Sequence, residues 1–118
     1  MTAMLGKVLI VEDEPRIRRF VRDALGREGC ETFEAGNVGD GLELAGAQHP
    51  DMIVLDLGLP DQSGLELIRN LRTWSSIPIL ILSARIAEQD KRVVQLVGNK
   101  LGALLPALDQ LDFIAFFE

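Results

Sequence analysis

The chain has 118 residues, 47% of them hydrophobic and 25% charged, which suits one globular domain with its own core and argues against disorder. Its net charge of -6 argues against broad binding to the phosphate backbone of nucleic acids. No apolar run is long enough to cross a membrane, no signal peptide precedes Lys7, and the single Cys30 excludes an internal disulfide, so we expect a cytoplasmic protein.

The chain begins with a strand-like run followed by a helical pattern. Val8–Val11 is a continuous apolar run, which is typical of a strand buried on both faces. Pro15 stands at a plausible first helical position, and Gly29 marks the helix end. Apolar residues in between recur at helical spacing, opposite a basic face. The apolar positions are Ile17, Phe20, Val21, Ala24 and Leu25, and the basic face carries Arg16, Arg18, Arg19 and Arg22.

The same alternation continues through the middle of the chain. We predict a weaker strand over 31–34 and a helix that ends before His49–Pro50. A second apolar run, Met52–Leu55, predicts another strand. The segment Gly58–Gly64 is rich in turn formers and predicts a loop, with a helix after it. Trp74 follows that helix, and we expect it to pack over an apolar edge.

A third apolar run, Ile79–Leu82, predicts the next strand, and the spacing of Ile86, Val93 and Val97 predicts a fourth helix. Alternating strands and helices favour a parallel, doubly wound α/β sheet with right-handed crossovers. Beyond Val93 the composition changes, because charged residues become rare and phenylalanines gather at the end. In this tail we expect a fifth strand over 101–105 and a helix over 107–117 that is apolar on nearly every face.

Each apolar run ends in a polar side chain. Glu12 and Asp13 follow the first run, Asp56 follows the second, and Ser83 follows the third. In parallel sheets, ligands bind in the crevice outside the carboxyl ends of the strands. The sequence therefore predicts one acidic pocket with a hydroxyl group beside it.

Three neighbouring carboxylates repel one another unless a cation lies between them. Mg²⁺ is the natural candidate, because it takes oxygen ligands and works with one or two carboxylates plus a phosphate. With the metal bound, a carboxylate can act as nucleophile toward a phosphoryl group and form an aspartyl phosphate. The alternative is that these acids merely solvate strand ends, which becomes improbable when three strand ends agree.

Three motifs carry a resemblance to a known family. They are VLIVEDEP at 8–15, IVLDLGLPDQSG at 53–64 and IPILILSAR at 77–85. Together they resemble the receiver domains of bacterial two-component response regulators, and most closely the OmpR/PhoB-type, winged-helix transcriptional regulators. Within that group, the segment from 56 to 85 is similar to the regulators of potassium-transport operons. The resemblance covers about residues 5–92 of a single domain spanning 1–118, and leaves 93–118 as a divergent tail.

The resemblance implies a role for each residue of the pocket. Asp56 would be the phosphoacceptor, and Ser83 would be the switch hydroxyl. Glu12 and Asp13 would hold Mg²⁺ together with Asp56, and the backbone carbonyl of Gly58 would complete the protein ligands. The implied fold is the flavodoxin-like five-stranded parallel sheet in the order 2-1-3-4-5.

The tail departs from the family pattern. Receivers carry a Lys-Pro pair at the end of the fifth strand, where the Lys contacts the phosphoryl group. An ungapped alignment places Pro106 on that Pro but Leu105 on the Lys. Without the Lys, we expect weaker phosphorylation and poorer coupling to the output surface. A frameshifted C-terminus would explain the change equally well.

The resemblance also implies partners. A sensor histidine kinase would donate the phosphoryl group, with the first-helix arginines as one docking surface. DNA would be bound only through a winged-helix domain that these residues do not contain. Family dimers use the fourth helix, fifth strand and fifth helix, the part altered here, so a homodimer stays open.

Three functions compete on the sequence alone. The first is a phosphoacceptor signalling domain that assists its own Mg²⁺-dependent phosphorylation and dephosphorylation without being an enzyme. The second is a degenerate receiver-like interaction or dimerisation module, impaired in switching by the missing Lys. The third is a phosphohydrolase with an Asp nucleophile, which is disfavoured because such enzymes usually need a second Asp where Gly58 stands.

Overall fold

The computed structural model describes residues 6–83 and 114–117. Its elements in chain order are β1 (Gly6–Val11), α1 (Pro15–Arg27), β2 (Cys30–Ala35), α2 (Val38–Gln48), β3 (Met52–Asp56), α3 (Gly64–Arg72), β4 (Ile79–Ser83) and β5 (Ile114–Phe117). The sheet order is β2-β1-β3-β4-β5, and β2, β1, β3 and β4 pair in parallel. The predicted flavodoxin-like α/β fold and its strand order 2-1-3-4 are therefore confirmed.

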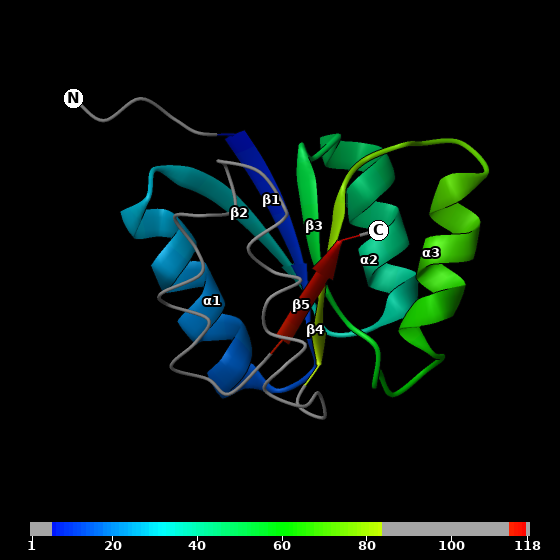
Figure 1. The fold of residues 1–118 in the computed structure, drawn as a ribbon, viewed down its shortest axis with the longest axis horizontal. Coiled ribbons are helices and arrows are strands. Elements are labelled where there is room, and N and C mark those ends of the chain that lie inside the picture. The colour runs from blue at the N-terminus through cyan, green and yellow to red at the C-terminus, as the bar shows by residue number, and fades with distance from the viewer. Residues whose placement is uncertain (1–5, 84–113, 118) are drawn as a thin grey trace.

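Helices cover both faces of the sheet, with α1 on one side and α2 and α3 on the other (Figure 1). This arrangement explains why the strands are apolar without alternation. The odd-numbered side chains Leu9, Val11, Ile53 and Leu55 join a buried cluster with Leu67 and Leu71 of α3. The even-numbered side chains Val8, Ile10 and Val54 are buried as well, and alternation along a strand turns them to the opposite face, where α1 lies.

Local sequence signals account for the helix ends. Pro15 occupies the first turn of α1, and the Glu14 side chain accepts a hydrogen bond from the amide of Arg16. His49 ends α2 in the left-handed conformation, with φ of 50°, and its amide donates to the carbonyl of Ala45. The predicted helix boundaries before Gly29 and before His49–Pro50 therefore agree with the structure.

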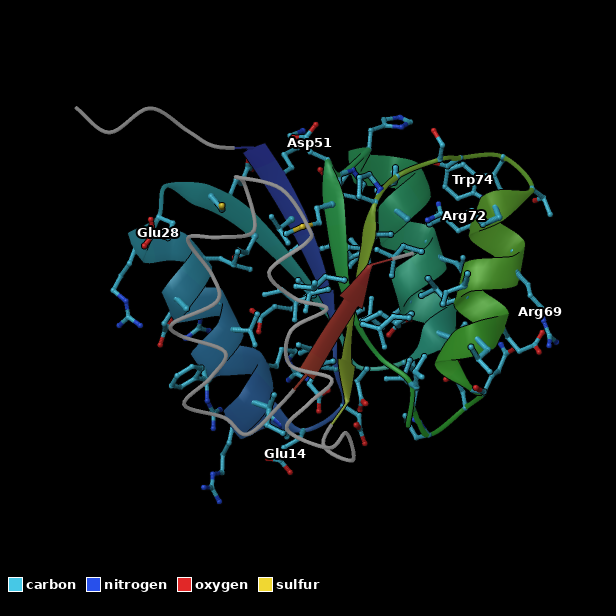
Figure 2. The ribbon with its side chains drawn as sticks, viewed as in Figure 1. Glu14, Glu28, Asp51, Arg69, Arg72 and Trp74 are labelled. Carbon is cyan, nitrogen blue, oxygen red and sulfur yellow. The ribbon has the colours of Figure 1, made fainter. Side chains whose placement is uncertain are left out.

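Trp74 differs from the expectation. Its side chain is 48% exposed, and its indole N–H donates to Oδ1 of Asn70 at 3.1 Å beside the end of α3 (Figure 2).

None of the helices within the described ranges is both long enough and apolar enough to span a bilayer.

The C-terminal end also differs from the expectation. Residues Ile114–Phe117 form a strand antiparallel to β4, where we predicted the end of a helix, and the helix prediction is wrong for these four residues. The helix prediction fails because a segment that is apolar on all sides has no hydrophobic periodicity that distinguishes a helix from a strand. Ile and Phe favour strands, and the edge of β4 offers unpaired backbone groups to which a strand can bond. The predicted fourth helix, the strand over 101–105 and the rest of the predicted last helix lie outside the described residues.

Candidate functional site

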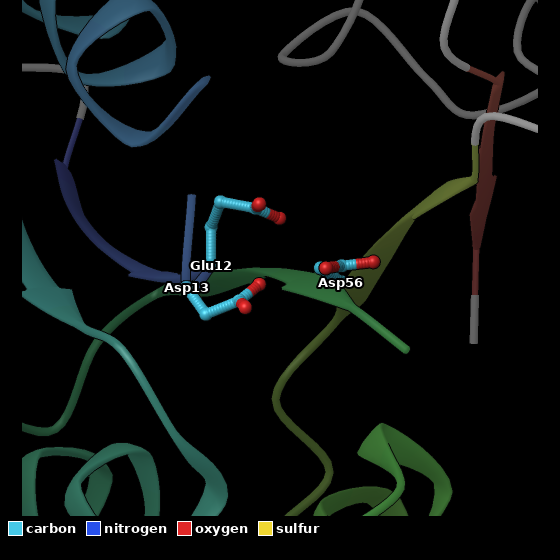
Figure 3. Close-up of side chains that lie close together, drawn as sticks. All are labelled: Glu12, Asp13 and Asp56. Atoms are coloured by element: carbon cyan, nitrogen blue, oxygen red, sulfur yellow. The ribbon is translucent and has the colours of Figure 1, made fainter. Parts of the chain in front are cut away.

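Three carboxylates meet at the carboxyl edge of the two central strands. Glu12 and Asp13 directly follow β1, and Asp56 is the last residue of β3. Because Val11 is paired with Leu55 across these parallel strands, the next residue on each strand reaches the same level of the sheet. One side-chain oxygen from each of the three acids lies within 4.8 Å of the others (Figure 3). The structure thus brings together the three acids that the sequence placed in one pocket.

Glu12 is the buried member of the cluster, with 4% of its surface exposed. Its amide donates to the carbonyl of Ala35 at the end of β2 at 2.9 Å, and its own carbonyl accepts from Nη1 of Arg18 at 2.9 Å. Its Oε1 accepts a hydrogen bond from the amide of Glu14 at 3.1 Å. The residue is therefore held at its backbone and at its carboxyl group.

The environment of Glu12 favours its protonated form. Burial raises the pKa of the Glu12 carboxyl to about 8, and the negative charge of Asp56 and a hydrogen bond with Asp56 act in the same direction. The Glu14 amide opposes this shift only in part. In the absence of a cation, the cluster thus relieves its repulsion by retaining a proton.

Asp56 is half-buried and is oriented by the loop that follows it. The amide of Gly58 donates to Oδ1 of Asp56 at 3.2 Å. A bridge between Gly58 and Ser63 and a 2.9 Å hydrogen bond from the Gly64 amide to the Leu57 carbonyl close the loop. This β3–α3 loop, residues 57–63, therefore holds a peptide group directly beside the Asp56 carboxylate.

Gly64 permits this close packing. A Cβ atom at this position would lie 2.7 Å from the Asp56 carbonyl oxygen and 2.9 Å from the Leu57 Cα. Both contacts are with backbone, which cannot move aside as a flexible side chain can. Only glycine allows α3 to begin so close to the end of β3.

The remaining predicted site residues are placed less completely. Ser83 ends β4 next to β3, where Asp56 is paired with Leu82, but the Ser83 side chain lies outside what the structure describes. Leu105 and Pro106 also lie outside the described residues.

Two residues near the site were not predicted individually. Arg18 was expected only as part of a basic helix face; besides its bond to Glu12, it pairs with Glu34 of β2 at 3.3 Å. Asp61 was expected only as a turn former, yet its carboxylate accepts hydrogen bonds from the amides of Val38 and Gly39 at the start of α2. The sequence shows that Arg18 lies in the first helix and that Asp61 lies in the loop after β3. It does not show which groups either side chain bonds to in the folded chain.

The donor atoms of the cluster suit a hard divalent cation. Carboxylate oxygens are the ligands that Mg²⁺ takes in proteins. The partly buried, mutually repelling charges of Glu12, Asp13 and Asp56 would be stabilised by a cation in place of the retained proton.

Fold and site together define an α/β domain of the flavodoxin-like type with an acidic, cation-suited pocket at the carboxyl edge of its sheet. The chain belongs to the response regulator receiver domain family, whose pattern matches residues 8–101. Together with the curated relatives that follow, this match confirms the predicted resemblance to receivers of OmpR/PhoB-type regulators.

Named relatives agree with this assignment. The chain is 56% identical over 87 residues to the KDP operon transcriptional regulatory protein KdpE of Escherichia coli, covering 74% of this chain and 39% of that protein. It is 40% identical over 84 residues to the transcriptional regulatory protein KdpE of Mycobacterium tuberculosis, covering 71% and 37%. The chain thus spans about two fifths of the length of these curated relatives. The structure is similar to the chemotaxis response regulator CheY4 of Vibrio cholerae, with a TM-score of 0.70 and 28% identity over 92% of this chain and 99% of that one.

Proposed function

We propose that Asp56 of this receiver domain accepts a phosphoryl group in a Mg²⁺-dependent reaction. Glu12, Asp13 and Asp56 would hold the cation with the backbone carbonyl of Gly58, and the hydroxyl of Ser83 would contact a phosphoryl oxygen. The observation that carries the proposal is the meeting of three carboxylates at the paired ends of β1 and β3.

The chain's own groups divide the work of phosphoryl transfer. A carboxylate oxygen of Asp56 attacks the phosphorus of the donor, the bond from phosphorus to the donor's leaving group breaks, and that group departs with its electron pair. The Gly58 amide, 3.2 Å from Oδ1, helps to orient the Asp56 carboxylate. When bound, Mg²⁺ would neutralise the charge that gathers on the transferred oxygens. Glu12 must release its proton for the metal to bind with all three acids ionised.

The partners follow from the family and its relatives. We infer that the donor in the cell is a sensor histidine kinase and that the protein acts in the cytoplasm, where a free thiol such as Cys30 stays reduced. The curated relatives are transcriptional regulators more than twice as long as the matched region. DNA would then be bound by a winged-helix domain outside these 118 residues. A second copy of the protein is a further candidate partner. We propose that residues 1–118 form one receiver domain with a divergent tail over 93–118.

The two other functions are less well supported. An interaction module without phosphate switching is not favoured, because the family match and the similarity to transcriptional regulators cover the acidic pocket itself. A phosphohydrolase would need a further carboxylate where Gly58 stands, and the relatives named above are regulators.

The test is the intact mass of the chain after incubation with acetyl phosphate, with and without Mg²⁺. We expect one phosphoryl adduct in the wild type that requires Mg²⁺, and no adduct in Asp56→Asn. Asp23→Asn is the matched control, because it makes the same chemical change at an exposed residue of α1, and it should be labelled like the wild type.

Two results would contradict the proposal. An adduct that persists in Asp56→Asn would place the phosphoryl group on another residue. A folded wild-type chain that gains no mass at saturating donor and Mg²⁺ would mean that this pocket does not perform the chemistry.

A further inference from the structure

The β3–α3 loop is tied to α2 through one side chain, that of Asp61. Its Oδ1 accepts hydrogen bonds from the amides of Val38 and Gln62, both at 2.9 Å, and its Oδ2 accepts from the amide of Gly39 at 3.0 Å. One carboxylate therefore spans two successive amides of a helix that precedes it in the chain and a third amide of its own loop.

These contacts complete the hydrogen bonding at the start of α2. The first amides of a helix have no partner inside the helix. Asn37, the residue before the helix, satisfies the amide of Asp40 with its side-chain oxygen at 2.8 Å, and its carbonyl accepts from Gly41 at 3.0 Å. The amides of Val38 and Gly39 are left over, and Asp61 satisfies both. These hydrogen bonds, led by the one from Val38, lower the pKa of Asp61, so its carboxylate is ionised at neutral pH.

The loop that Asp61 anchors also orients the phosphoacceptor. The Gly58–Ser63 bridge and the bond from Gly64 to Leu57 close the base of the loop, and the Gly58 amide contacts Asp56. In the chain, Asp61 lies between Gly58 and Ser63, the two residues of that bridge. Its attachment to α2 therefore limits how far the segment containing Gly58 can turn relative to Asp56.

We propose that Asp61 is a positioning residue for the metal and phosphoryl site: by fixing the loop on α2, it holds the Gly58 peptide in the orientation that binds Mg²⁺. The inference rests on the proposed function, because it assigns Gly58 a role as metal ligand. Residues that orient metal ligands typically change metal affinity by about 10- to 100-fold when they are removed. Since Asp61 acts through a loop, we expect the lower end of that range.

The test compares two variants that remove a cap from the same helix. Asp61→Ala removes the bonds from Val38, Gly39 and Gln62. Asn37→Ala removes both side-chain bonds between Asn37 and Asp40. Both weaken the start of α2, but only Asp61→Ala releases the loop. In the full chain, Mg²⁺ is titrated and followed by the amide NMR signals of Gly58 and Asp13, and the rate of adduct formation is measured against Mg²⁺ concentration.

We expect Asp61→Ala to raise the Mg²⁺ dissociation constant about tenfold. Its labelling rate should fall at low Mg²⁺ and recover at saturating Mg²⁺, whereas Asn37→Ala should bind Mg²⁺ like the wild type. Asp61→Asn keeps an acceptor oxygen and should lie between wild type and Asp61→Ala. This variant also carries the comparison if Asp61→Ala does not fold.

Equal Mg²⁺ affinity in folded Asp61 variants and wild type would overturn the inference, since Asp61 would then only cap α2. Equal weakening by Asp61→Ala and Asn37→Ala would overturn it too. Failure of the proposed function is recognised separately, because the wild type itself would then bind no Mg²⁺ or gain no phosphoryl group.

Discussion

Glu12 retains its proton in the folded chain at pH values where it is ionised in the unfolded chain. Its pKa is about 8 in the folded state and near 4.5 otherwise, so the folded chain binds more protons than the unfolded chain between these values. The free energy of unfolding must then fall as the pH rises through this window. The contribution of Glu12 is fully present below about pH 4.5 and is lost above about pH 8.

This dependence can be measured by urea unfolding between pH 5 and pH 8 in a buffer with a metal chelator. We expect the wild type to lose about 3–4 kcal/mol over this range in excess of Glu12→Gln, which cannot ionise at that position. Identical pH slopes in the two proteins would show that Glu12 is not the group responsible.

At the level of single residues, those at the ends of strands were predictable, and those that bond to distant segments of the chain were not. The meeting of Glu12, Asp13 and Asp56 at one edge of the sheet was predictable, because Glu12–Asp13 and Asp56 directly follow two apolar runs. The raised pKa of Glu12 was not, since it depends on burial and on the distance to Asp56. The bonds from Asp61 to α2 were not predictable either, because they join two segments that only the folded chain brings together.

At the scale of secondary-structure elements, the close approach of β3 and α3 at Gly64 gives a prediction for the free energy of unfolding. Gly64→Ala would place a methyl group against two backbone atoms, and we expect a loss of about 1–3 kcal/mol in unfolding free energy. Gly46→Ala is the matched control, because Gly46 lies inside α2 and a Cβ added there would meet no atom within 4 Å. It should gain about 0.5–1 kcal/mol, as alanine is the better helix former.

Urea unfolding of both glycine variants measures the difference. A Gly64→Ala protein as stable as the wild type would refute the packing argument at Gly64. Because a Cβ atom at position 64 would press on the Asp56 carbonyl oxygen, we further expect Gly64→Ala to slow Mg²⁺-dependent labelling, while Gly46→Ala leaves it unchanged.

The elements themselves were largely predictable up to β4. Continuous Val, Ile and Leu runs indicated β1, β3 and β4, because strands covered on both faces have no polar side to interrupt the pattern. The weaker strand predicted over 31–34 corresponds to β2, Cys30–Ala35. The end of the chain was not predictable, since Ile114–Phe117 has no polar residue to indicate which side of an element faces solvent.

At the scale of the whole molecule, a cation that binds only the folded chain must raise its melting temperature. At a Mg²⁺ concentration 100 times the dissociation constant, the gain is about 2.7 kcal/mol, which corresponds to roughly 10 °C for a domain of this size. We expect this shift in wild type by differential scanning calorimetry, and its loss in Asp13→Asn.

Asp23→Asn controls for the change in net charge, and should respond to Mg²⁺ like the wild type. An equal shift in Asp13→Asn would mean that Mg²⁺ binds elsewhere. Ca²⁺ tests whether the site requires the short, octahedral coordination of Mg²⁺. Because Ca²⁺ has longer and more flexible coordination, it should shift the melting temperature by a different amount at equal concentration.

The pairing of Val11 with Leu55 has a consequence for the synthesis of the protein. Glu12 and Asp56 are far apart in the chain and are brought together only when β1 and β3 pair, because α1, β2 and α2 separate these two strands in the sequence. A single-residue slip in that alignment would turn one strand's side chains to the other face and dismantle the pocket. If Asp56 is the phosphoacceptor that we propose, a chain in which β1 and β3 have not yet paired would not be phosphorylated. The gain of phosphate during refolding would then report when these two central strands pair.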